Sequence, residues 1–168
     1  MSLVTDSWTS RVISSGSDPY GLGRWSYIIL RGSNNSTICL ITAYRVCLHR
    51  YTGPKTAYQQ QTRYLSFFNR QYNINTHPEP HRQFILDLQS WIETLIDQDL
   101  KIILTLDNND EIQSDQGGLC PLTYQAPKPT VEKQYDGSLE SLMKSTGLVD
   151  ILAHQHPSPS YPATYNHG

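Results

Sequence analysis

Apolar residues along this chain recur with two spacings, one typical of strands and one typical of helices. Short runs rich in β-branched and aromatic residues predict strands at 24–31, 37–47 and 101–106. The polar residues 32–36 favour a hairpin turn between the first two. The second run is apolar at every position from Ile38 to Ile41, which is typical of an interior strand covered on both faces.

Helical spacing predicts three helices. The clearest one begins at Pro80, a residue suited to the first turn of a helix, and ends near Asp97 to Asp99. Its apolar residues repeat every three or four positions and form one stripe: Phe84, Leu88, Trp91, Ile92 and Leu95, widened by Ile85 and Ile96. Residues 56–68 and 138–144 have the composition of two further helices, and Gly147 is a suitable stop for the second.

Helices that alternate with apolar strands predict a sheet with at least one helix-covered face, so the fold belongs to the α+β or α/β class. A helix bundle and a closed barrel are excluded by the same alternation. Residues 112–135 are rich in Gln, Gly and Pro and predict a long loop. We expect residues 1–20 to form a weakly ordered N-terminal extension and residues 21–168 to form the domain.

Length, charge and cysteine content limit the kinds of protein that this chain can be. The 168 residues suit one domain with one core, and the formal charge of -2 gives no general attraction to nucleic acid. Any nucleic-acid contact must therefore depend on local residues. The three cysteines cannot all pair, and we interpret them as reduced thiols. The chain shows no signal peptide and no apolar run long enough for a membrane, so we expect an intracellular protein, cytoplasmic or nuclear, without a membrane partner.

Candidate chemistry lies first at Asp107-Asn108-Asn109, directly after the apolar run 101–106. A carboxylate at the carboxyl end of a covered strand is in a common position for an active site. Asp107 can bind a hard cation or take a proton from water, and the amide of Asn109 can donate to a phosphate oxygen. The alternative is an ordinary Asx-rich turn after a strand, because Asn and Asp favour turns.

A second candidate, Tyr44-Arg45, lies at the end of the other apolar strand. If the two strands are neighbours, Tyr44 and Asp107 lie on one rim of the sheet. A phenol and a guanidinium can both hold a phosphodiester, which makes Arg45 a candidate substrate-binding residue. The alternative is a half-buried strand tyrosine beside a solvated arginine.

Histidines and aromatic residues give weaker signals. His154 and His156 have a spacing that could bind metal, but Pro157 follows and no acidic or thiol ligand is nearby, so a polar loop is the simpler interpretation. His77 and His81 are interpreted in the same way. Arg24-Trp25 could stack on bases, although packing within the core is more common for such a pair.

Four segments, in order, resemble the endonuclease/exonuclease/phosphatase superfamily (deoxyribonuclease I-like), in the divergent form found beside reverse transcriptases in retroelements. Residues 21–26 resemble the family's early glycine and strand, and residues 41–46 resemble its strand with an active-site Tyr. Residues 104–109 resemble its G-D-x-N motif. Residues 147–151 together with 163–165 resemble the approach to its last motif. The resemblance implies two packed, mostly antiparallel sheets flanked by helices, and Mg²⁺-dependent hydrolysis of DNA (or RNA) phosphodiesters.

Carried over by position, the resemblance implies that Asp107 orients or deprotonates the attacking water. Asn109 would steady the phosphate in the transition state, and Tyr44 would contact it. A metal would stabilise charge on the phosphate and leaving oxygens. The metal ligands stay unknown, because the family's metal-binding Glu and its N-terminal Asn are not found before Gly21.

The chain departs from the family pattern at other positions too. Leu106 replaces the glycine before the aspartate, and the final Asp and Asp-His dyad are not present before the last residue, Gly168. We therefore expect a domain that is incomplete at both ends and has little or no nuclease activity alone. Two alternatives are a catalytically inactive nucleic-acid or protein interaction module that keeps the fold, and a phosphatase acting on small molecules or lipids.

Overall fold

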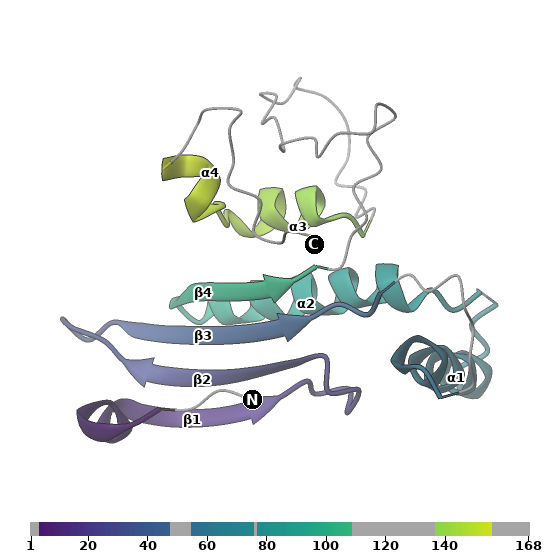
Figure 1. Ribbon diagram of the computed structural model, residues 1–168, viewed down its shortest axis with the longest axis horizontal. Helices are drawn as coiled ribbons and strands as arrows, with labels where there is room; N and C mark the ends of the chain where they lie inside the picture. Colours follow the sequence, from purple (N-terminus) through teal and green to yellow (C-terminus); the bar gives the residue numbers. More distant parts are fainter. Residues whose placement is uncertain (1–3, 48–54, 76, 109–136, 156–168) are drawn as a thin grey trace, which may run out of the picture.

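The computed structural model describes residues 4–47, 55–75, 77–108 and 137–155 (Figure 1). Its regular elements are η1 (Asp6–Arg11), β1 (Val12–Ser17), β2 (Trp25–Arg31), β3 (Thr37–Tyr44), α1 (Ala57–Gln71), α2 (Pro80–Asp97), β4 (Leu100–Asp107), α3 (Leu139–Thr146) and α4 (Ile151–Gln155). The chain is α+β, as the alternation of strands and helices predicted. None of the described helices combines the length and the apolar character needed to cross a bilayer.

The strands form one open, mixed sheet in the order β1-β2-β3-β4. The pairs β1–β2 and β2–β3 are antiparallel, and β3–β4 is parallel. A parallel pair needs a long connection that returns the chain to the same end of the sheet, and the segment with α1 and α2 provides it. Of the two sheets that the family resemblance implied, the described residues contain one.

The β2–β3 hairpin turns where the sequence predicted it. Asn34 and Asn35 both have positive φ angles, 52° and 59°, which asparagine tolerates better than most residues. The hydroxyl of Ser36 donates to the carbonyl oxygen of Ser33 at 2.7 Å and closes the turn. The two strands then pair without interruption from Arg31 opposite Thr37.

The core lies between one face of the sheet and the helices α2 and α3 (Figure 1). Side chains from α2 and α3 pack on the inward positions of β3, and the buried members are Cys39, Ile41, Ala43, Phe84, Ile85, Leu88, Ile92 and Leu142. Trp25 of β2 extends this core by stacking on Trp91, with ring centroids 5.7 Å apart. The apolar stripe predicted for the central helix is therefore correct, apart from Ile96, which is exposed.

The opposite face of the sheet is more open in the described part of the chain. On that face Ile28 and Leu30 of β2 are buried, Ile38 and Leu40 of β3 are partly buried, and Ile103 of β4 is 49% exposed, so exposure increases toward β4. The prediction was that both faces of β3 are covered. Among the described residues, helices cover one face of β3, and its other face is only partly buried.

Helix ends follow local rules. The side-chain oxygens of Thr56 and Ser138 accept hydrogen bonds from the backbone amides of Gln59 and Ser141, at 3.3 and 3.1 Å, and so cap α1 and α3. Gly147 ends α3 with a φ of 69°, a left-handed angle that glycine adopts without steric cost. The sequence predicted α1, α2 and α3 within a few residues of their observed bounds.

Strand β1 corrects the prediction that residues 1–20 are weakly ordered. Val12–Ser17 pairs along β2 as an edge strand, and η1 precedes it. This strand was not predicted because the segment is serine-rich and mostly exposed, without the alternation of a half-buried strand. Gly16 lies under the ring of Tyr27: a Cβ there would be 2.6 Å from the Tyr27 hydroxyl oxygen, so a larger residue would require that side chain to move.

Candidate functional site

Tyr44 and Asp107 are the last residues of the two parallel strands β3 and β4, and they occupy the same register position. Side chains alternate along each strand, and the preceding residues Ala43 and Leu106 pack into the helix-covered core. Tyr44 and Asp107 therefore lie together on the open face of the sheet. Both are exposed, Tyr44 to 45%.

Backbone contacts fix the position of this pair. The amide of Arg45 donates to the carbonyl oxygen of Asp107 at 2.9 Å, one residue past the end of the ladder. The amide of Tyr44 donates to the carbonyl oxygen of Arg24 at 2.8 Å. The hydroxyl oxygen of Tyr44 lies 3.8 Å from the sulfur of Cys47, an exposed free thiol. The strand ends are thus held in one geometry, while the phenol and the carboxylate face solvent.

Asn109, the third residue expected in this site, lies outside the described residues. Its predicted place beside Tyr44 and Asp107 therefore stays a prediction. The residue before it, Asn108, is partly buried and interacts with a different element.

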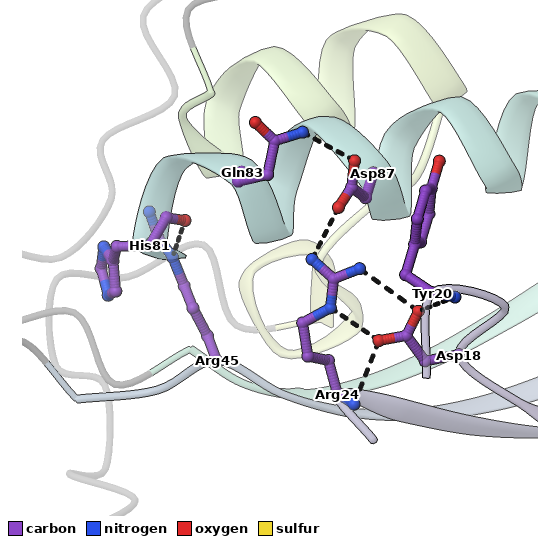
Figure 2. Close-up of polar contacts among 7 residues, drawn as sticks. All are labelled: Asp18, Tyr20, Arg24, Arg45, His81, Gln83 and Asp87. Atoms are coloured by element: carbon purple, nitrogen blue, oxygen red, sulfur yellow. Dashed lines mark hydrogen bonds and ion pairs between the residues drawn. The ribbon is translucent and has the colours of Figure 1, made fainter. Parts of the chain in front are cut away.

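Arg45 points away from Tyr44 and Asp107. Its guanidinium is buried, with the residue 5% exposed, and it reaches the first turn of α2 (Figure 2). Nε donates to the carbonyl oxygen of His81 at 3.0 Å, and Nη1 donates to Oδ1 of Asn108 at 3.2 Å. These bonds connect the ends of β3 and β4 to α2. The sequence predicted Arg45 to bind substrate; the structure gives it contacts within the fold.

A buried ionic cluster between the β1–β2 connection and α2 was not predicted from the sequence. Arg24 donates from Nε and Nη2 to the carboxylate of Asp18, at 2.7 and 3.2 Å, and from Nη1 to Oδ2 of Asp87 at 2.6 Å (Figure 2). Asp87 also accepts from the amide of Gln83 at 2.8 Å, and Asp18 accepts from the backbone amide of Tyr20 at 2.9 Å. The cluster joins the β1–β2 connection to α2.

Burial and the neighbouring carboxylates shift the pKa of Arg24 in opposite directions. Desolvation alone would lower the pKa of its guanidinium, but the bonds to Asp18 and Asp87 outweigh it, and the pKa is raised. The guanidinium therefore stays protonated. One signal in the sequence could have revealed the cluster: Asp87 falls within the apolar stripe of α2, next to Leu88 and one turn after Phe84, where a charge needs a buried partner. The Arg24-Trp25 pair is accordingly part of the core.

Metal ligands are few on the open face. Asp107 is the only carboxylate within the four strands. In the ranges that the structure describes, no three or more His, Cys, Asp or Glu side chains gather closely enough to hold a metal ion. Mg²⁺ usually keeps several waters and is held by one or two carboxylates together with substrate phosphates. Asp107 could supply one such carboxylate, and no chemical step is assigned to a metal. Of the six histidines, His81 is buried and His77 and His154 are exposed; His49, His156 and His167 lie outside the described residues.

Comparison with known proteins adds no relative. No protein-family model matches the chain, and neither the curated proteins nor the solved structures include a significant match to it. Arguments about function therefore depend on the arrangement of the residues themselves.

Proposed function

We propose that this chain is the central part of a metal-dependent phosphodiesterase domain, an endonuclease that in complete form hydrolyses DNA phosphodiester bonds, of the kind associated with retroelements. The observation that carries the proposal is the pairing of Tyr44 and Asp107 at the carboxyl ends of neighbouring parallel strands, on the open face. A phenol and a carboxylate at adjacent register positions can face one bound phosphate.

Each of the two side chains has a distinct role in this proposal. The Tyr44 hydroxyl donates a hydrogen bond to a nonbridging phosphate oxygen, and the Asp107 carboxylate orients the attacking water and accepts its proton. Asn109, two residues after Asp107 in the sequence, is proposed to donate its amide to the same phosphate. The Mg²⁺ ion that the resemblance implies stays part of the proposal, although Asp107 is the one described strand residue that could help to hold it.

An activated phosphodiester tests the proposal, because its good leaving group lets a weakened site turn over measurably. With bis(4-nitrophenyl) phosphate and Mg²⁺ we expect slow turnover that is lost in Asp107→Ala and reduced in Tyr44→Phe. Plasmid DNA should be nicked little or not at all, since a site lacking one member of a concerted set loses about three or more powers of ten in rate. Asp97→Ala is the matched control, because Asp97 is an exposed carboxylate at the end of α2.

The competing functions give different results in the same assay. A catalytically inactive interaction module would show no turnover that depends on Asp107, even if it binds a DNA duplex. A phosphatase would prefer phosphate monoesters or phosphoinositides to the diester. Turnover unaffected by Asp107→Ala and Tyr44→Phe would contradict the proposed site directly.

A further inference from the structure

A cavity of about 540 Å³ lies away from Tyr44 and Asp107, where α1 meets the first half of α2 and the β1–β2 connection. Figure 1 shows α1 beyond the ends of the strands, so that it forms one wall of this space rather than part of the sheet's cover. The volume is in the range of sites that take small organic ligands or single side chains. Its chemistry is not used by the proposed phosphodiesterase site.

The floor of the cavity is acidic. Asp87 and Gln83 both line it, and Asp87 belongs to the buried ionic cluster of two carboxylates, Asp18 and Asp87, around one guanidinium, Arg24. Counting two negative charges and one positive charge leaves that cluster with a net charge of -1. Because Asp18 takes two of the guanidinium's bonds, at Nε and Nη2, Asp87 receives a single one. The other oxygen of Asp87, Oδ1, accepts from Gln83 at 2.8 Å. Each oxygen thus accepts one bond and keeps a second lone pair as acceptor capacity toward the cavity.

The pKa of a neighbouring tyrosine agrees with a negative charge at Asp87. The pKa of Tyr20, which also lines the cavity, is raised by burial and then by the charge of Asp87, although Arg24 acts in the opposite direction. A cation entering this space would be attracted by the same potential. Glu79 and Arg82, exposed residues that also line the cavity, carry opposite charges and cancel each other.

Three aromatic rings contribute to the wall beside aliphatic and polar side chains. Tyr20 comes from the β1–β2 connection, where its ring stands beside Asp87 (Figure 2) and already has the Arg24 guanidinium 5.3 Å from its centroid. Tyr64 and Phe68 lie one turn apart on α1, and no cationic side chain of the described residues lies over their rings. Aromatic faces attract cations and also pack against apolar stems. An acidic floor with aromatic walls therefore favours one kind of ligand over neutral or anionic groups.

We infer that this cavity binds an organic cation, an ammonium or guanidinium on an apolar stem, with the charged head at Asp87 and the stem between Tyr20, Tyr64 and Phe68. The cation can come from a free small molecule or from a lysine or arginine side chain of a polypeptide. Both share the same head-group chemistry, and the test separates them. This inference does not depend on the proposed phosphodiesterase activity.

An NMR titration of the ¹⁵N-labelled chain with benzylammonium, benzyl alcohol and benzoate tests the charge preference. We expect saturable shifts of the Tyr20, Tyr64 and Gln83 amide signals with benzylammonium, and a dissociation constant about tenfold lower than for the alcohol. Benzoate should not saturate. Equal binding of all three probes, or no saturation by benzylammonium at about 10 mM, would overturn the inference.

Two variants at exposed aromatic residues of α1 test the location. Tyr64→Ala removes an aromatic wall residue that is 41% exposed and should weaken benzylammonium binding about two- to fivefold. Phe67→Ala removes a 64% exposed ring that does not line the cavity and should leave binding unchanged. Equal effects of the two would place binding elsewhere. Asp87→Asn should weaken benzylammonium binding about tenfold if the variant folds. If it does not fold, the comparison of Tyr64→Ala with Phe67→Ala determines whether the cavity is the binding site.

The source of the cation is decided by two further probes. A capped lysine and a short lysine-containing peptide are titrated in the same way. Tighter binding of the peptide than of benzylammonium points to a protein side chain, whereas binding of the free amine without the peptide points to a small-molecule ligand. Either outcome supports the cation site, and failure of both together with benzylammonium refutes it.

Discussion

Arg24 and Asp87 are 63 residues apart in the chain, and their side chains meet at 2.6 Å in a buried ion pair. Arg24 directly precedes β2 and Asp87 lies in the middle of α2, so this contact fixes the helix against the β1–β2 connection. The cluster also forms the floor of the proposed cation site. Its energetic role can be measured separately from any ligand.

Arg24→Met should lower the free energy of unfolding by about 3–5 kcal/mol, because it leaves the carboxylates of Asp18 and Asp87 buried without their cation. Urea denaturation measures the change. Arg31→Met is the control, since Arg31 is exposed at the end of β2 and should change stability by less than about 0.5 kcal/mol. Combining Arg24→Met with Asp87→Asn should recover part of the loss, and a purely additive result would show that the pair is not coupled.

Substitutions at Arg45 test whether this residue stabilises the fold or binds substrate. Arg45→Met removes the bonds to His81 and Asn108 and should cost about 1–3 kcal/mol of unfolding free energy. Arg45→Lys keeps the charge but not the forked donors, so it should recover little of that loss. If Arg45→Lys instead retains wild-type stability and lowers only the affinity for a DNA duplex, the role first predicted from the sequence is the correct one.

Gln89 provides a case in which a polar residue in the core is expected to be dispensable. It is fully buried on α2, its amide nitrogen donates to Oε1 of Glu93 at 3.1 Å, and its Oε1 has no partner among the described residues. Because an unsatisfied buried acceptor is costly, Gln89→Met should be neutral or stabilise the chain by up to about 1 kcal/mol. Thermal unfolding measures it. A loss like that of Leu88→Ala, about 2–5 kcal/mol, would contradict this account.

The two cysteines of β3 and its continuation should differ in reactivity. Burial raises the pKa of the Cys39 thiol to about 11, whereas Cys47 is exposed. Iodoacetamide at pH 8 should therefore label Cys47 in the native chain and leave Cys39 unmodified until the chain unfolds. Peptide mass spectrometry reads out each site. Equal native labelling of Cys39 and Cys47 would show that β3 is not covered as described.

The same pKa shift implies a loss of stability at high pH. In the unfolded chain Cys39 ionises near its ordinary pKa of 9.0, while the folded chain keeps the thiol protonated until about 11. As pH rises between these values the unfolded state gives up the proton first, so the free energy of unfolding falls. Cys39→Val should flatten this part of the stability curve relative to wild type. An unchanged slope would assign the loss to other groups, such as the tyrosines.

The apolar patterns alone were enough to predict three strands, three helices and the α+β class. Runs such as residues 101–106 and the stripe from Phe84 to Leu95 carry their period in the sequence, because each buries one face or both. The carboxyl ends of these runs also identified Tyr44 and Asp107 as candidate residues. The segment 12–17 was missed, since an exposed edge strand leaves no such period.

Register and side-chain direction were decided only by the tertiary structure. Parallel pairing of β3 with β4 brings Tyr44 and Asp107 together on one face, while Arg45, the next residue, turns to the other and becomes buried. The sequence alone could not show that Arg45 is buried while Tyr44 is exposed. A charged residue at a strand end is expected to face solvent unless the fold brings it a partner, here the carbonyl oxygen of His81. The Asp18–Arg24–Asp87 cluster shows the same limit: its ions are stable in the interior only through contacts between residues distant in the chain.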